Sequence, residues 1–185
     1  KKERNKASVM TRETFGMTFM LFGAIMFFIA VTGKLVFGSV GTAITAFFVG
    51  LFGFLFYPLD LLFIYLGFVM VFGKKPIPAK WLLRFFLLTL SIFLIVHLAT
   101  SERFVSEGFG GYMGGCWNAA GASAAAGTGG GVILGLIVYP IRSLFHVAGA
   151  YVVFSLLLAA ALFYVLMGTP LRGLVFRKRV RAEQA

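Results

Sequence analysis

Three consecutive glycines, Gly129, Gly130 and Gly131, stand directly before the apolar run VILGLIVYP, and a glycine-rich loop of this kind can hold a phosphate on its backbone amides. That chemistry needs the pattern G-x-x-x-x-G-K-[ST], in which the lysine and the hydroxyl contact phosphate and magnesium. Neither Gly33-Lys34 nor Gly73-Lys74 is followed by serine or threonine or preceded by a correctly spaced glycine. The triple glycine therefore predicts a tight turn into an apolar helix, because glycine tolerates unusual backbone dihedrals.

No other residue pattern favours catalysis or metal binding. The two histidines, His97 and His146, are not spaced as a pair of metal ligands, and both are predicted to lie at a membrane interface. No serine has a plausible base and orienting acid. The single cysteine, Cys116, excludes a disulfide within one chain and a multi-cysteine metal site. We therefore expect no catalytic residue, cofactor or metal in this chain.

Composition indicates the solvent in which the chain folds. Of the 185 residues 60% are apolar and 12% are charged, whereas a soluble domain carries about 25% charged residues. A transmembrane helix needs about 20 mostly apolar residues. Four stretches meet or approach that requirement, namely residues 15–37, 57–73, 81–99 and 150–168. The predicted fold is an all-α integral membrane domain over residues 15–168.

The second span lies in an apolar run, residues 42–72, that is too long for one crossing. Pro58 is the expected break, because proline removes a backbone donor and clashes with the preceding turn. We predict a half helix from about 40 to 55, lying in the outer leaflet or re-entering it. The same arrangement, with Pro140, is predicted before the fourth span.

Basic residues set the expected orientation. All lysines and arginines except Lys34, Arg103 and Arg142 fall before the first span, in or next to the link between the second and third spans, or in the tail. Such residues collect on the cytoplasmic side. Residues 1–14 and 169–185 are therefore predicted to be cytoplasmic. Residues 100–131 become an outer loop, which its glycine and alanine content predicts to be flexible or lightly folded, with Phe104, Phe109, Tyr112 and Trp117 as interfacial anchors.

Two regions match at an offset of 82 residues, and Gly53, Tyr57 and Pro58 correspond to Gly135, Tyr139 and Pro140. In this register Asp60 and Arg142 occupy equivalent places. Charges at membrane depth are costly unless paired or hydrated, so the two residues form a candidate ion pair. The alternative is that each reaches the outer headgroups independently.

The C-terminal third resembles the end of the four-span N-terminal membrane domain of the FtsK/SpoIIIE DNA translocases. The resemblance covers residues 129–176: the glycine turn with Gly135, a break at Gly149, a span to Met167, the exit Gly168-Thr169, and a basic tail over residues 171–181. It implies that the chain is a fragment and that residues 169–185 begin the cytoplasmic linker.

The resemblance also implies a function. The domain would anchor and oligomerise a DNA translocase at the septum of the bacterial inner membrane, in chromosome segregation, cell division or sporulation. It would not itself be an enzyme. The absent motor would bind ATP, magnesium and DNA and form the hexamer, while the lipid bilayer and septal division proteins would be the partners of this part.

Two alternatives stay open at this point. In a small transporter or channel subunit, Asp60 and Arg142 would face a water-filled cavity on the substrate path. In a membrane scaffold, the outer loop would bind a partner.

Overall fold

The computed structural model describes residues 2–73, 78–122 and 128–168, and within them every element is helical. Four helices are long and apolar enough to cross a membrane: Arg12–Gly33, Leu35–Phe72, Ala79–Phe104 and Gly131–Met167. The predicted class, an all-α membrane domain with four spans, is confirmed.

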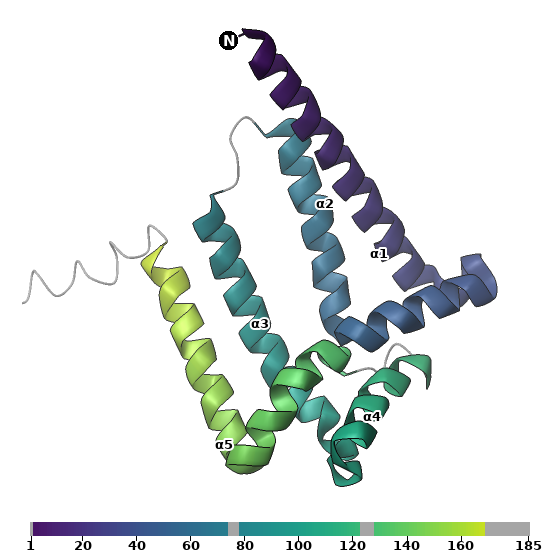
Figure 1. Ribbon diagram of the computed structural model, residues 1–185, viewed down its shortest axis with the longest axis vertical. Coiled ribbons are helices and arrows are strands. Elements are labelled where there is room, and N and C mark those ends of the chain that lie inside the picture. Colours follow the sequence, from purple (N-terminus) through teal and green to yellow (C-terminus); the bar gives the residue numbers. More distant parts are fainter. Residues whose placement is uncertain (1, 74–77, 123–127, 169–185) are drawn as a thin grey trace, which may run out of the picture.

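The first half of the molecule comprises α1 (Lys2–Phe52), a single 3-10 turn η1 (Gly53–Leu55) and α2 (Phe56–Phe72). Helix α1 is broken at Gly33 (φ 37°) and Gly38 (φ 58°), positive φ values that glycine adopts with little strain. The chain reverses there, and residues 39–52 run across the end of the first span to reach α2 (Figure 1). We call residues 39–52 the first half helix.

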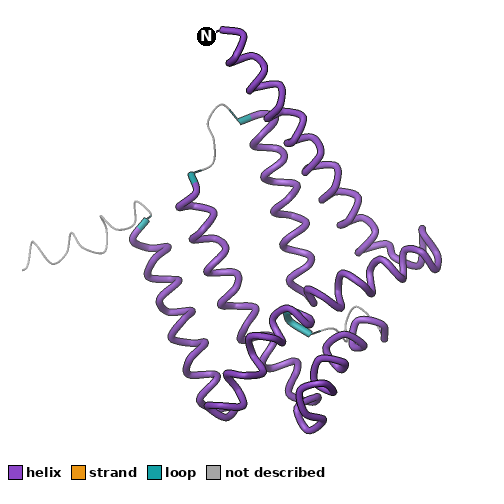
Figure 2. Tube along the Cα trace, viewed as in Figure 1, coloured by secondary structure: helices purple, strands orange, loops and turns teal. Residues whose placement is uncertain are grey.

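The second half comprises α3 (Ala79–Ser101), a 3-10 turn η2 (Glu102–Glu107), α4 (Gly108–Ala122) and α5 (Gly131–Met167). Helix α5 is broken at His146 (φ 60°, ψ 173°). The break divides α5 into the second half helix, residues 131–145, and a span, residues 147–167. In Figure 2 the tube of α5 folds back on itself between the half helix and the span. The half helices before the second and fourth spans are therefore present.

The ends of the spans sort to two sides of the molecule (Figure 1). The beginning of α1, the facing ends of α2 and α3, and the end of α5 lie at one end. Both half helices and α4 lie at the other. The basic tail predicted over residues 171–181 lies outside the described residues.

The boundaries differ from the sequence prediction in three places. The first span ends at Gly33 rather than at 37. The bend before α2 lies at Gly53, and Pro58 stands in the first turn of α2, where a missing N–H costs nothing. In the second half the bend lies at His146 rather than at Gly149, and Pro140 lies inside the half helix.

The predicted lightly folded loop, residues 100–131, is largely helical. Its described part holds η2 and α4. Glycine and alanine content misled the prediction, because small residues also allow helices to pack closely. Tyr112, assigned to an interface, is fully buried, as is Cys116.

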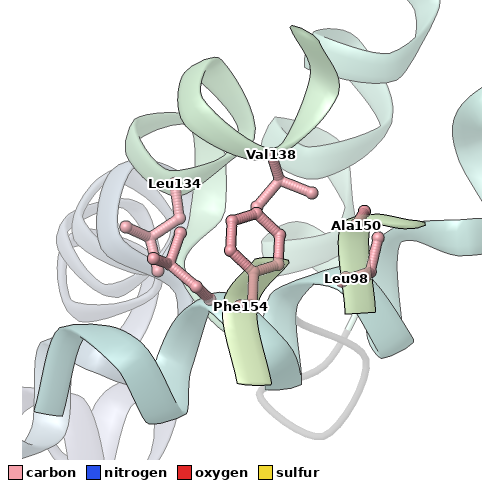
Figure 3. Packing of buried hydrophobic residues seen from close by; sticks show 6 residues of the cluster. Leu98, Leu134, Val138, Ala150 and Phe154 are labelled. Atoms are coloured by element: carbon pink, nitrogen blue, oxygen red, sulfur yellow. The ribbon is translucent and has the colours of Figure 1, made fainter. Parts of the chain in front are cut away.

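Each half has its own apolar core. In the first, Met26, Ala30, Val49 and Phe56 join the first span and the first half helix to α2. In the second, the core joins α3 to both arms of α5 and contains Leu94, Leu98, Leu134, Val138, Ala150 and Phe154. Figure 3 shows Phe154 reaching from the span toward Val138 of the half helix. The half helices are thus packed against the spans through buried side chains.

An arginine near the beginning of each half's first helix caps the end of its partner span. Arg12 donates to the carbonyls of Val69 (3.0 Å) and Gly73 (2.6 Å) at the end of α2. Arg84 lies 3.5 Å from the Gly168 carbonyl at the end of α5 and over the ring of Tyr164. The carbonyls of Gly73 and Gly168 lie at helix ends, where the helix itself supplies no donor, whereas the Val69 carbonyl also accepts from the Gly73 N–H.

Candidate functional site

The triple glycine lies where the two halves meet. The backbone amides of Phe54 and Leu55 donate to the carbonyls of Thr128 (3.0 Å) and Gly129 (3.1 Å). A Cβ on Gly53 would lie 2.0 Å from the Thr128 oxygen, and one on Gly131 2.4 Å from the Gly50 oxygen. We call Gly53 together with residues 128–131 the glycine junction. Glycine is required there because backbones approach too closely for a side chain.

The amides of the three consecutive glycines are all used within the protein. Gly129 N–H donates to Thr100 Oγ1 (3.0 Å), Gly130 N–H to His97 Nδ1 (3.1 Å) and Gly131 N–H to Thr128 Oγ1 (3.0 Å). Phosphate loops present such amides to the ligand. Here the amides of Gly129 and Gly130 bond to α3 and that of Gly131 bonds within the turn, so the junction is a structural joint.

Next to the junction lies a closed polar cluster of His97, Ser101, Tyr112 and Cys116, all buried. His97 Nδ1 accepts from Gly130, so the neutral ring carries its hydrogen on Nε2 and donates to Tyr112 Oη at 3.0 Å. Tyr112 donates to Ser101 Oγ at 2.8 Å, and Ser101 donates to the carbonyl of His97 at 2.6 Å. His97, which was predicted to lie at a membrane interface, is enclosed by protein side chains.

This His97 cluster contains residue types that can form a nucleophilic site, but its hydroxyls are engaged. Burial raises the pKa of the Tyr112 phenol, and it raises the pKa of the Cys116 thiol to about 11. A thiol with so high a pKa stays protonated and is a weak nucleophile. The cluster therefore fixes α4 against α3.

The expected pair of Asp60 and Arg142 is not formed. Asp60 is 1% exposed in α2, and its Oδ2 has no hydrogen-bond partner in the described part of the chain. Arg142 instead places NH2 3.8 Å from Glu102 Oε1. The sequence register made the two residues equivalent, but the bends at Gly53 and His146 do not follow that register.

A cavity of about 270 Å³ opens beside the bend in α5. Its described lining is Tyr139, Arg142, Ser143, His146 and Val147, and we call it the elbow pocket. Of the predicted site residues, only Arg142 lines it. Pro140 is exposed near it, and Gly149 lies in the span just after the bend.

Other predicted positions serve packing. Gly135 lies in the second half helix, where a Cβ would come within 3.3 Å of the Tyr112 ring. Among the residues that the structure describes, no three of His, Cys, Asp and Glu are grouped so that they could hold a metal ion.

Several residues of these sites had no signal in the sequence. Thr100, Ser101 and Thr128 become important only because segments distant in sequence meet. Glu102 lies in the segment predicted to be an outer loop. A useful signal was present in the lone polar residues within apolar stretches, such as His97, which had to find partners when buried.

Comparison with protein-family models, with curated proteins and with solved structures found no match.

Proposed function

We propose that this domain is the membrane anchor and oligomerisation platform of a DNA translocase of the FtsK/SpoIIIE type, acting at the bacterial division septum. The observation that carries the proposal is the order of elements in the C-terminal third. A glycine turn at 129–131 opens the second half helix, a bend follows, and a span runs to Met167. This is the order that the resemblance to the family implies.

The internal bonding favours an anchor over a conducting path. The polar groups of the glycine junction and the His97 cluster are bonded to one another. The transporter alternative expects Asp60 and Arg142 to face one cavity. Arg142 lines the elbow pocket, but Asp60 is not among the described residues that line it.

The last span is built to resist a pull from its cytoplasmic end. Ala150 and Phe154 are fully buried in the second core, and Arg84 contacts the carbonyl of Gly168. Force on a linker that follows the span would be borne by the α3 and α5 core. In this mechanism the domain tethers the motor, raises its local concentration and transmits force to the bilayer. The motor binds ATP, magnesium and DNA.

The test is to sequence the gene beyond the codon for Ala185. The proposal expects a linker followed by an ATPase with the pattern G-x-x-x-x-G-K-[ST]. A stop codon shortly after Ala185 would reject the translocase. A fluorescent fusion of the full-length protein should then concentrate at division septa, and an even membrane distribution would reject the septal role.

A further inference from the structure

Four of the five described residues that line the elbow pocket carry a polar side chain. Arg142, Ser143, Tyr139 and His146 bring a guanidinium, a hydroxyl, a phenol and an imidazole to one cavity, and Val147 completes the described lining. Ser143 Oγ donates its hydrogen to the Pro140 carbonyl at 2.9 Å, so this hydroxyl can only accept a further hydrogen bond. The volume of about 270 Å³ is several times the roughly 30 Å³ of one water molecule in the liquid. The pocket has room for a small polar group.

Arg142 lacks adequate partners for its charge. Its side chain is 12% exposed, and NH1 is buried without a hydrogen-bond partner in the described chain. Glu102 is 3.8 Å away, too far for a strong hydrogen bond, and is itself 56% exposed. A guanidinium has five donors arranged to match a carboxylate or a phosphate. The described residues therefore compensate the positive charge of this guanidinium only weakly.

His146 adds a second sign. Its dihedrals, φ 60° and ψ 173°, fall in a region that essentially only glycine adopts without strain. Such strain concentrates where ligands are held. The structure retains a histidine at this position, at the wall of the pocket, although a glycine would relieve the strain.

The depth of the pocket fits the headgroup level of a bilayer. The span from 147 to 167 covers about 31 Å at 1.5 Å a residue, close to the hydrocarbon thickness. Its far end lies at the same end of the molecule as the beginning of α1, which is the end predicted to face the cytoplasm, so the elbow lies at the opposite interface (Figure 1). Leu144 and Phe145, next to the pocket in sequence, are 78% and 57% exposed and could contact acyl chains.

We propose that the elbow pocket binds a negatively charged phosphate group through Arg142, with Tyr139 and His146 as further donors. The phosphate is either the headgroup of an anionic phospholipid or free inorganic phosphate. This site is independent of the translocase function.

The experiment is a thermal-shift titration of the full chain in a neutral detergent. Three probes are compared: dioleoylphosphatidylglycerol, dioleoylphosphatidylcholine, and sodium phosphate against sodium chloride at equal ionic strength. A headgroup site predicts stabilisation by phosphatidylglycerol well above that by phosphatidylcholine. A free-anion site predicts stabilisation by phosphate instead.

Arg142→Gln should weaken the effective probe by about tenfold or more, because the charge-assisted bonds are lost. The matched control is Arg103→Gln. It makes the same charge change at a residue outside the described lining of the pocket. The control should retain the response.

Glu102→Gln should strengthen binding rather than weaken it, and this test does not depend on the folding of the arginine variant. Glu102 competes for the guanidinium, so its neutralisation should tighten binding by about threefold or more. The proposal is overturned if neither probe stabilises the wild type, if Arg142→Gln responds like Arg103→Gln, or if Glu102→Gln binds no more tightly.

Discussion

The two halves of the molecule turn a half helix into a span at nearly the same φ, 58° at Gly53 and 60° at His146. In the first half the residue is glycine and its surroundings are crowded by backbone. In the second it is a histidine whose side chain lines an open pocket. The first bend is thus fixed by close packing, whereas the second tolerates a strained residue that brings a side chain to a cavity.

The largest effect should come from adding a methyl group at the first bend. Gly53→Ala combines a positive φ with a Cβ 2.0 Å from the Thr128 oxygen, which is backbone and cannot move aside freely. We expect a loss of about 3 kcal/mol or more, measured as a fall in melting temperature and loss of the monodisperse peak in detergent. Gly114→Ala, with nothing within 4 Å of its Cβ, is the control and should change little. Equal behaviour of the two variants would contradict a crowded junction.

A smaller loss is expected from the His97 cluster, which only the second half possesses. Tyr112→Phe removes the hydroxyl that links His97 to Ser101 and leaves both without that partner. The expected cost is about 1 to 2 kcal/mol by thermal or denaturant unfolding. Tyr65→Phe, at a 45% exposed position in α2, should cost close to nothing. If both variants melt alike, the cluster does not hold α4 in place.

A substitution at the second bend should raise the stability of the protein rather than lower it. His146→Gly relieves the strained backbone and should raise stability by about 1 kcal/mol. His146→Ala loses the imidazole without relieving the strain, so it should not raise the melting temperature. A stabilising alanine together with a neutral glycine would show that the two bends do not differ as described.

The lone cysteine offers a test by pH. The pKa of Cys116 is raised to about 11, so about one thiol in a hundred is ionised at pH 9. Maleimide labelling of the folded protein should therefore stay slow from pH 7 to 9, whereas an exposed thiol would react much faster over that range. Rapid labelling at pH 9 with the fold intact would place Cys116 outside the cluster.

The spans could be predicted because each is a long apolar run, and a run of that kind carries its own signal. The bends could be predicted only in part. Gly53 lies within the apolar run without a further local mark, whereas Pro58 carries a strong local signal for a break. Nothing local marks His146, and the residue 82 positions after Gly53 is Gly135, which lies inside a helix.

The folding of residues 108–122 into α4 was missed for a different reason. Its composition is that of a loop, and its burial depends on contacts of Tyr112 and Cys116 with α3. The sequence did not indicate the site partners Glu102, Thr100 and Thr128, since a hydrogen bond or ion pair between distant segments leaves no local pattern. By contrast, three glycines in a row did indicate the tight turn at Gly129 to Gly131.

We propose that the two sides of the molecule face opposite sides of the membrane, with the termini in the cytoplasm. The most direct measurement is cysteine accessibility in intact cells with an impermeant maleimide. Asn118→Cys, exposed on α4, should be labelled before lysis, and Ala79→Cys, exposed at the beginning of α3, only after lysis. Native Cys116 remains as a buried internal control and should stay unlabelled in both. Labelling of Ala79→Cys in intact cells, with Asn118→Cys protected, would show the opposite orientation.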